Sequence, residues 1–194
     1  DDNVIPARGK VSGALKYAGD MVMPGMLHMQ VLRSPHPHAI IESIDVSEAE
    51  AMEGVEGVIT CADVPGEDGF GVFVHDQPVM ARGKVRYVGE AVAAVASEDA
   101  VTARRALSKI KVRYQPLPAV FDPHEAMRPE APLLHDYAPD NVTKHIPIRK
   151  GDVGAGFAQS DLVVEQDYDT QAIEHAYLEP EAGLGYVDAD GVVT

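Results

Sequence analysis

The stretch of sequence that decides the fold runs from Val85 to Ala96 and reads VRYVGEAVAAVA. From Val88 onward it carries small and β-branched residues on both faces, which is typical of a strand buried inside a domain. Residues 98–108 follow with helical spacing, Val101, Ala103 and Leu107 on the apolar side and arginines on the other. Residues 110–120 then read IKVRYQPLPAV, where apolar and basic residues alternate until two prolines end the strand. This succession predicts a βαβ-like unit in a domain of the α/β (α+β) class.

More strands are expected upstream of this unit. Residues 26–32 and 39–46 are apolar runs, and the spacer between them, SPHPH, contains two prolines that forbid regular structure. Ser47 and Glu50 have the form of a capping box, which predicts a short helix that Gly54 ends. A third strand is expected over residues 57–61. Residues 65–71 read as a loop, and short strands are expected at 72–74 and 79–80.

The composition changes near residue 122. A short helix with proline in its first turn is expected to open at Asp122, and residues 128–141 hold several prolines and little periodicity, as linkers do. Beyond them we expect a helix over 152–158 capped by Asp152, a strand over 162–170, and a hairpin over 184–193 that turns at Asp190-Gly191. A hairpin cut off so soon after its turn leads us to expect a longer polypeptide.

Composition limits the possible functions. Apolar residues make up 45% of the 194 residues, which indicates a globular chain, and no apolar run is long enough to span a bilayer. The N-terminal residues lack the pattern of a signal peptide, so we expect a cytoplasmic protein. A formal net charge of -15 argues against a nucleic-acid partner. The single cysteine, Cys61, cannot supply the ligands of an iron–sulfur cluster and is expected to be a small buried residue.

Several residues could carry chemistry, but a structural role suits most of them better. His36 and His38 lack the ligand spacing of a metal site, so we expect them to bond backbone groups. The GDVGAG sequence from Gly151 is better explained as a capped helix start than as a phosphate loop. Glu90 is expected to serve packing rather than acid catalysis. His175 and Glu179 would share a helix face, but the proline at 180 argues against a helix.

Six short motifs occur in the order in which one enzyme family carries them: GKVSG at 9–13, RSPHPHA at 33–39, IDVS at 44–47, VRYVGEAVAAVA at 85–96, KGDV at 150–153 and EHAYLEP at 174–180. The chain resembles the molybdenum-binding subunit of xanthine dehydrogenases and aldehyde oxidases along nearly its whole length. The resemblance implies an a/b hammerhead domain over residues 1–122, a linker over 123–145, and the start of the molybdopterin-binding domain over 146–194.

The resemblance also implies a cofactor and partners. Gln171, Glu174 and His175 are expected to contact the molybdopterin cofactor or its pocket. The family places a glutamine two residues before the histidine of its motif, and here that position is Ile173, which weakens a xanthine dehydrogenase assignment. The family's catalytic glutamate and glycine-rich pterin segment come later in the polypeptide, so no catalytic residue and no metal ligand are expected in this chain. Iron–sulfur clusters and FAD are expected on partner chains or domains.

Two functions follow from these observations. In the first, the chain is an inactive scaffolding fragment of an enzyme that hydroxylates a purine, an N-heterocycle or an aldehyde with oxygen from water. In the second, it is an autonomous acidic binding or adaptor module that reuses the hammerhead fold without a cofactor, because a fold does not fix a function.

Overall fold

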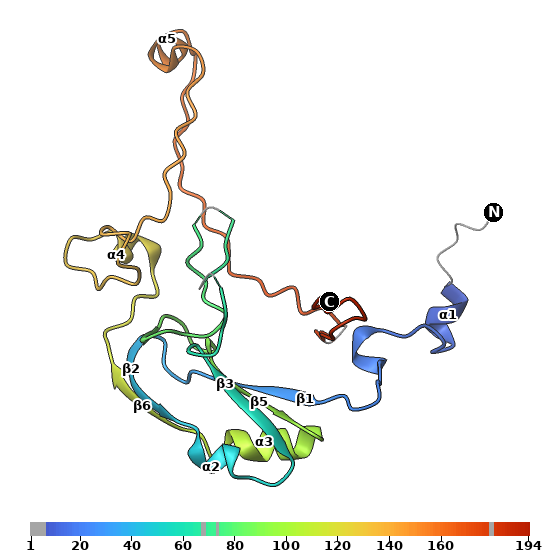
Figure 1. The fold of residues 1–194 in the computed structure, drawn as a ribbon. Coiled ribbons are helices and arrows are strands. Elements are labelled where there is room, and N and C mark those ends of the chain that lie inside the picture. The colour runs from blue at the N-terminus through green and yellow to red at the C-terminus, as the bar shows by residue number, and fades with distance from the viewer. Residues whose placement is uncertain (1–6, 67–68, 73, 179–180) are drawn as a thin grey trace. The chain divides into compact units, whose positions relative to one another are not determined.

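The computed structural model describes residues 7–66, 69–72, 74–178 and 181–194 (Figure 1). The chain divides into two compact units: one holds residues 25–146, and the other holds residues 1–24 together with 147–194. Within the described ranges, no helix has both the length and the apolar character needed to cross a membrane.

The first sheet of unit 25–146 is built around the strand that the sequence singled out. It has the order β1-β5-β3 and is antiparallel, with β1 at His28–Arg33, β5 at Ala91–Ser97 and β3 at Val55–Thr60. In β5, Val92, Ala93, Ala94 and Val95 are all buried. Small side chains on both faces let β5 lie at the centre of the sheet with layers packed on either side, as predicted.

The second sheet has the order β4-β2-β6, with β4 at Lys84–Val85, β2 at Ala39–Asp45 and β6 at Lys111–Pro116. In β6, Lys111 and Arg113 are exposed while Val112 and Tyr114 are half-buried, which confirms the predicted alternation. Ile44 and Val112 pack against the buried clusters of both sheets, so the two sheets share one core.

The predicted βαβ-like unit needs correction in its pairing. The order of strand, helix and strand is confirmed, but β5 and β6 lie in different sheets, and the ladders among the described strands are antiparallel. The central strand also begins at Ala91 rather than Val88, because the residues before it form a turn in which Gly89 has φ +93°. The sequence pattern indicated the burial of each strand but carried no information about its neighbours.

Helix α3, at Ala100–Leu107, packs against β1, β3 and β5 (Figure 1). Asp99 caps it by accepting hydrogen bonds from the backbone N–H groups of Val101 and Thr102. The helix buries Ala103 and Ala106, whereas Val101 is 67% exposed. The expectation that Val101 lies on the apolar side was therefore wrong, because the close approach of the helix to the sheet uses its alanine face.

Helix α2, at Ser47–Glu50, forms where it was expected but not through a capping box. The Asp45 carboxylate instead accepts hydrogen bonds from the Ser47 N–H and hydroxyl. The N-cap residue of α2 makes no side-chain hydrogen bond to the helix. Gly54 then adopts φ +81° at the turn into β3, as its predicted role in ending the helix requires. Cys61, expected to be buried, is only half-buried, because it follows the end of β3.

The short strands expected between β3 and β4 do not form as predicted. Residues 79–80 lie in a bend, and residue 73 of the expected strand 72–74 lies outside the described residues. Phe70 and Gln77 instead form an isolated antiparallel bridge. Helix α4, at Pro123–Ala126, opens as expected at Asp122, whose carboxylate accepts from two backbone N–H groups.

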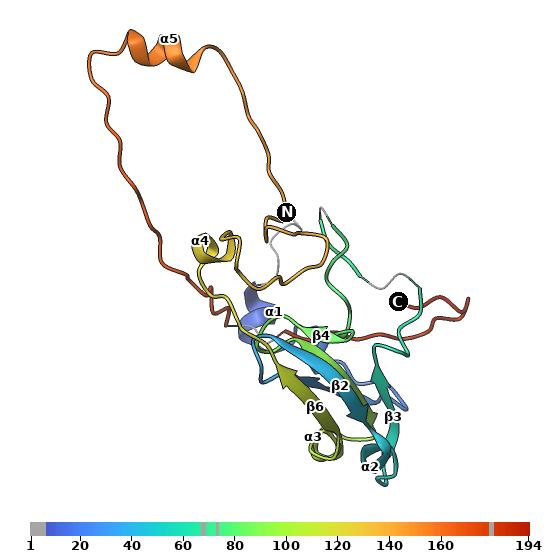
Figure 2. The same cartoon turned by 90° about the vertical axis from the view of Figure 1, so that its left-hand side faces the viewer.

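The unit made of residues 1–24 and 147–194 has little regular structure. It contains α1 at Ala7–Val11, a 3-10 turn η1 at Ala18–Asp20, and α5 at Val153–Ala158, capped by Asp152 as predicted. Val187 pairs with Val193 in the predicted hairpin. The prediction of a strand over 162–170 was wrong, because residues 162–177 are exposed and lie outside any helix or strand (Figure 2).

Candidate functional site

The three residues predicted to contact a cofactor lie in this exposed stretch. Gln171, Glu174 and His175 are all exposed. Glu174 accepts a hydrogen bond from the Ala176 backbone N–H over 3.3 Å, and Ala176 adopts the left-handed φ of +49°. This turn lays the His175 ring parallel to the Tyr177 ring, with centroids 5.5 Å apart. Glu174 and His175 thus each contact a residue two positions further along the chain.

The described residues of this segment do not by themselves form a cofactor site. An amide, a carboxylate and an imidazole suit hydrogen bonding to a pterin, but exposed side chains on an extended chain enclose nothing. Nor do the described residues contain a group of three or more histidine, cysteine or acidic side chains able to hold a metal ion. Glu179, the proposed helical partner of His175, lies outside the described residues.

The histidines between β1 and β2 have structural partners. The Nδ1 atom of His38 lies 2.7 Å from the carbonyl oxygen of Pro118, and the side chain is only 3% exposed. The His36 ring meets the Tyr114 ring edge-on at 4.9 Å. Burial raises the pKa of Tyr114. The prediction of a backbone hydrogen bond is confirmed for His38.

Glu90 acts as a structural anchor beside β5. Its carboxylate is buried and accepts a hydrogen bond from the Arg86 backbone N–H over 2.5 Å. The neighbouring Gly89 donates its N–H to the Ser34 carbonyl and accepts from the Arg33 guanidinium at its own carbonyl, both over 2.8 Å. The turn therefore joins the end of β1 to the start of β5, as the packing interpretation predicted.

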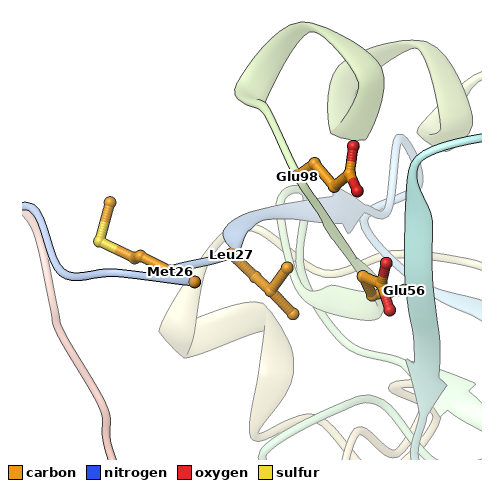
Figure 3. Close-up of a pocket in the computed structure, with 5 residues that line it drawn as sticks. Met26, Leu27, Glu56 and Glu98 are labelled. Carbon is orange, nitrogen blue, oxygen red and sulfur yellow. The ribbon is translucent and has the colours of Figure 1, made fainter.

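A shallow hollow of about 500 Å³ lies at the end of the first sheet. It is lined by Gly25, Met26, Leu27, Glu56 and Glu98 (Figure 3). Sequence reasoning missed it because its residues come from three separate segments. Two carboxylates at its wall disfavour a phosphate-bearing ligand, so it does not suit an anionic cofactor.

Two family models match successive parts of the chain. Residues 12–118 match the aldehyde oxidase and xanthine dehydrogenase a/b hammerhead domain, and residues 134–194 match the molybdopterin cofactor-binding domain. The chain belongs to the aldehyde oxidase and xanthine dehydrogenase family. The family resemblance found in its sequence motifs is thereby confirmed.

Individual relatives agree with this assignment. A protein of Bacillus subtilis described as a probable xanthine dehydrogenase component is 45% identical, over 96% of this chain and 25% of its own length. The nicotinate dehydrogenase large molybdopterin subunit of Eubacterium barkeri is 38% identical, over 95% of this chain and 43% of its own length. The chain thus spans between a quarter and a half of these relatives.

A solved structure of the family supports the fold. The aldehyde oxidoreductase of Desulfovibrio gigas superposes with a TM-score of 0.85 at 33% identity, covering 95% of this chain and 22% of the other. The predicted class, a hammerhead domain followed by the start of the molybdenum cofactor-binding domain, is confirmed.

Proposed function

We propose that this chain is the N-terminal part of the molybdopterin-binding subunit of a molybdenum hydroxylase. The complete enzyme hydroxylates a carbon of a purine, an N-heterocycle or an aldehyde with oxygen from water and passes the electrons to iron–sulfur clusters and FAD on partner chains or domains. The observation that carries the proposal is the succession of a hammerhead match and a molybdopterin-domain match within one chain. A cytoplasmic location is part of the same proposal.

The role of this chain in that enzyme is scaffolding. Residues 1–122 form the hammerhead domain, 123–145 the connection, and 146–194 the start of the molybdopterin-binding domain. The chain shapes the approach to the cofactor and offers surface to the other domains, while the reacting groups come from later residues. By itself the chain is inactive.

The complete polypeptide provides the direct test. It should be produced with its iron–sulfur and FAD partners in molybdenum-replete cells, and metal content and turnover of xanthine, nicotinate and benzaldehyde measured in ¹⁸O-labelled water. Bound molybdenum and labelled product support the proposal. A complete polypeptide that folds but holds no molybdenum and hydroxylates none of the three would overturn it in favour of the adaptor function.

Gln171, Glu174 and His175 are proposed to contact the cofactor or its pocket in the complete enzyme. The contacts around Ala176 support this for Glu174 and His175, because they place an imidazole and a carboxylate within one short motif. His175→Ala and Gln171→Ala should each lower molybdenum retention or kcat. The matched control is Asp167→Ala, an equally exposed position of the same extended segment. Unchanged metal content and kinetics in both variants would reject these site residues.

A further inference from the structure

One face of the first sheet is directed away from α3. Residues that pair directly across an antiparallel ladder lie on the same face of the sheet. Val95 pairs with Val58, and both pack in one buried cluster with Ala106 of α3, so they lie on the face that α3 covers. Met29 pairs with Ala96, the next residue of β5, and therefore lies on the opposite face.

This opposite face, which we call the outer face, has large apolar side chains at its edges and small residues along its middle. Met29 on β1 is 61% exposed and Ile59 on β3 is 42% exposed, and both strands are edges of the sheet. The middle is formed by Ala94 and Ala96 of β5, of which Ala96 is partly exposed. Gly57 of β3 pairs with Ala96 and has no side chain. The outer face therefore offers a shallow apolar trough that another backbone can approach closely.

The hollow of about 500 Å³ adjoins the outer face. Leu27, which lines the hollow and is 45% exposed, precedes Met29 by two residues. Glu56 is the extra residue of a β-bulge, where the register of β3 against β5 shifts, and such bulges redirect side chains. Glu98 directly follows β5. The bulge and the strand end thus bring two carboxylates to one hollow beside exposed apolar side chains (Figure 3).

These two carboxylates are not neutralised within the part of the chain that the structure describes. Glu56 and Glu98 are exposed, and the ion pairs and side-chain hydrogen bonds among the described residues do not include them. By contrast, Glu48 on α2 forms an ion pair with Lys111 on β6. Two like charges that line one hollow repel each other and favour a cation between them.

We propose that the outer face and the hollow form a docking surface for a partner chain, which lays an amphipathic helix on the trough and places a basic side chain between Glu56 and Glu98. The identity of the partner rests on the proposed function: it is a chain that carries the iron–sulfur clusters or FAD. A second copy of this chain suits the surface poorly, because a symmetric contact would bring like carboxylates together and each copy has a formal net charge of -15.

The unpaired charges favour a partner chain over a later segment of the same polypeptide. An ion pair buried within one folded chain adds little stability, because both charges lose their water. Between chains, complementary charges speed the encounter and fix the orientation of the two partners. An apolar centre with a charged rim is also the usual composition of a contact between chains.

Association of the complete polypeptide with its iron–sulfur and FAD partners tests the apolar part of the surface. Met29→Asp should lower the affinity about tenfold or more, because it places a carboxylate in the centre of the contact. The matched control is Val101→Asp, since Val101 is 67% exposed on α3, which covers the other face of the sheet. The control should keep the wild-type affinity, and both variants should keep the wild-type unfolding temperature. Equal affinities of the two variants, or no association of the wild type, would overturn the docking surface.

A second pair of variants tests the charges. The double variant Glu56→Gln, Glu98→Gln should weaken the association and make it less sensitive to salt, because the steering charges are gone. The double variant Glu50→Gln, Glu130→Gln makes the same change of charge at exposed positions outside the hollow and should leave both properties unaltered. Equal effects of the two double variants would contradict a basic side chain in the hollow.

Hydrogen exchange of the complete polypeptide, with and without its partners, identifies the occupant. The amides of the edge strands, residues 28–33 and 55–60, should gain protection when the partners bind. Full protection in the polypeptide alone would assign the outer face to later residues of the same chain and overturn the proposal. Molybdenum content and turnover report separately on the proposed function. An active, molybdenum-loaded complex that is indifferent to Met29→Asp would reject the docking surface alone.

Discussion

At the scale of single residues, the burial of a position determines how much an introduced charge lowers the free energy of unfolding. Val92 is fully buried in β5, and Val101 is 67% exposed on α3. Val92→Asp should cost on the order of 4 kcal/mol, because it places a carboxyl among apolar side chains in a domain whose whole stability is roughly 5–15 kcal/mol. Val101→Asp should change stability by no more than about 0.5 kcal/mol. Thermal unfolding measures both, and equal melting temperatures would contradict the assignment of β5 as the central strand.

Asp99 gives a residue-scale prediction about pH. Its carboxylate accepts from the Thr102 hydroxyl over 2.6 Å and from two N–H groups of the first turn of α3. The Thr102 hydroxyl is the main reason that the pKa of Asp99 is lowered. A lowered pKa stabilises the folded state above the pKa of the unfolded chain, and this contribution disappears as pH falls through the folded value.

Asp99→Ala should therefore lower the melting temperature at about pH 6, and the difference from wild type should shrink towards about pH 3, where carboxylates become protonated. Asp99→Asn retains a capping oxygen without the titration, so it should stay closer to wild type at the higher pH. A wild-type to alanine difference that is constant across this range would show that the cap does not depend on the charge.

At the scale of elements, the sequence predicted what each segment buries better than what it pairs with. Strand β6 and helix α3 were predictable because their apolar residues follow a period of two or of 3.6, and β5 because small and β-branched residues form a continuous run. The division of β5 and β6 between two sheets was not, because pairing depends on contacts between distant residues. The false strand at 162–170 has the same origin: alternation indicates a possible strand, but a strand forms only where a neighbour completes its ladder.

Contacts between residues that are distant in the sequence were also not predictable at the candidate site and in the connecting segment. The EHAYLEP motif identified Glu174 and His175 through local sequence alone, and their turn is indeed local. The contact of Tyr137 with Asp76 joins residues 61 positions apart and leaves no sequence pattern. Proline-rich composition at 128–141 instead suggested a linker, although Asn141 donates to the Pro132 carbonyl and Arg86 donates to the Leu134 carbonyl.

Elements that differ in ladder pairing should differ in local stability. Amides of β5, paired on both sides by β1 and β3, should exchange slowly, and those of β6 that bond to β2 should also be protected. Residues 162–177 lie outside any helix or strand and should exchange at nearly the intrinsic rate. Hydrogen exchange followed by mass spectrometry measures the difference between the strand amides and the amides of residues 162–177. Strong protection over 162–177 would mean that this stretch finds backbone partners in solution.

At the scale of the whole molecule, the 194-residue chain should not retain a molybdenum cofactor. The region that matches the cofactor-binding domain exposes Gln171, Glu174 and His175 on extended chain, and the molecule carries a formal net charge of -15. A pterin bearing phosphate needs converging N–H donors or basic groups in an enclosed site. Chain purified from molybdenum-replete cells should therefore contain far less than one metal per chain and turn over neither xanthine nor an aldehyde with an added electron acceptor. The complete polypeptide, produced in the same cells, is the control. Stoichiometric molybdenum or turnover in the 194 residues alone would contradict this prediction. It would mean that these residues fold into an enclosed cofactor site, and that the later residues of the polypeptide are not needed to hold the cofactor.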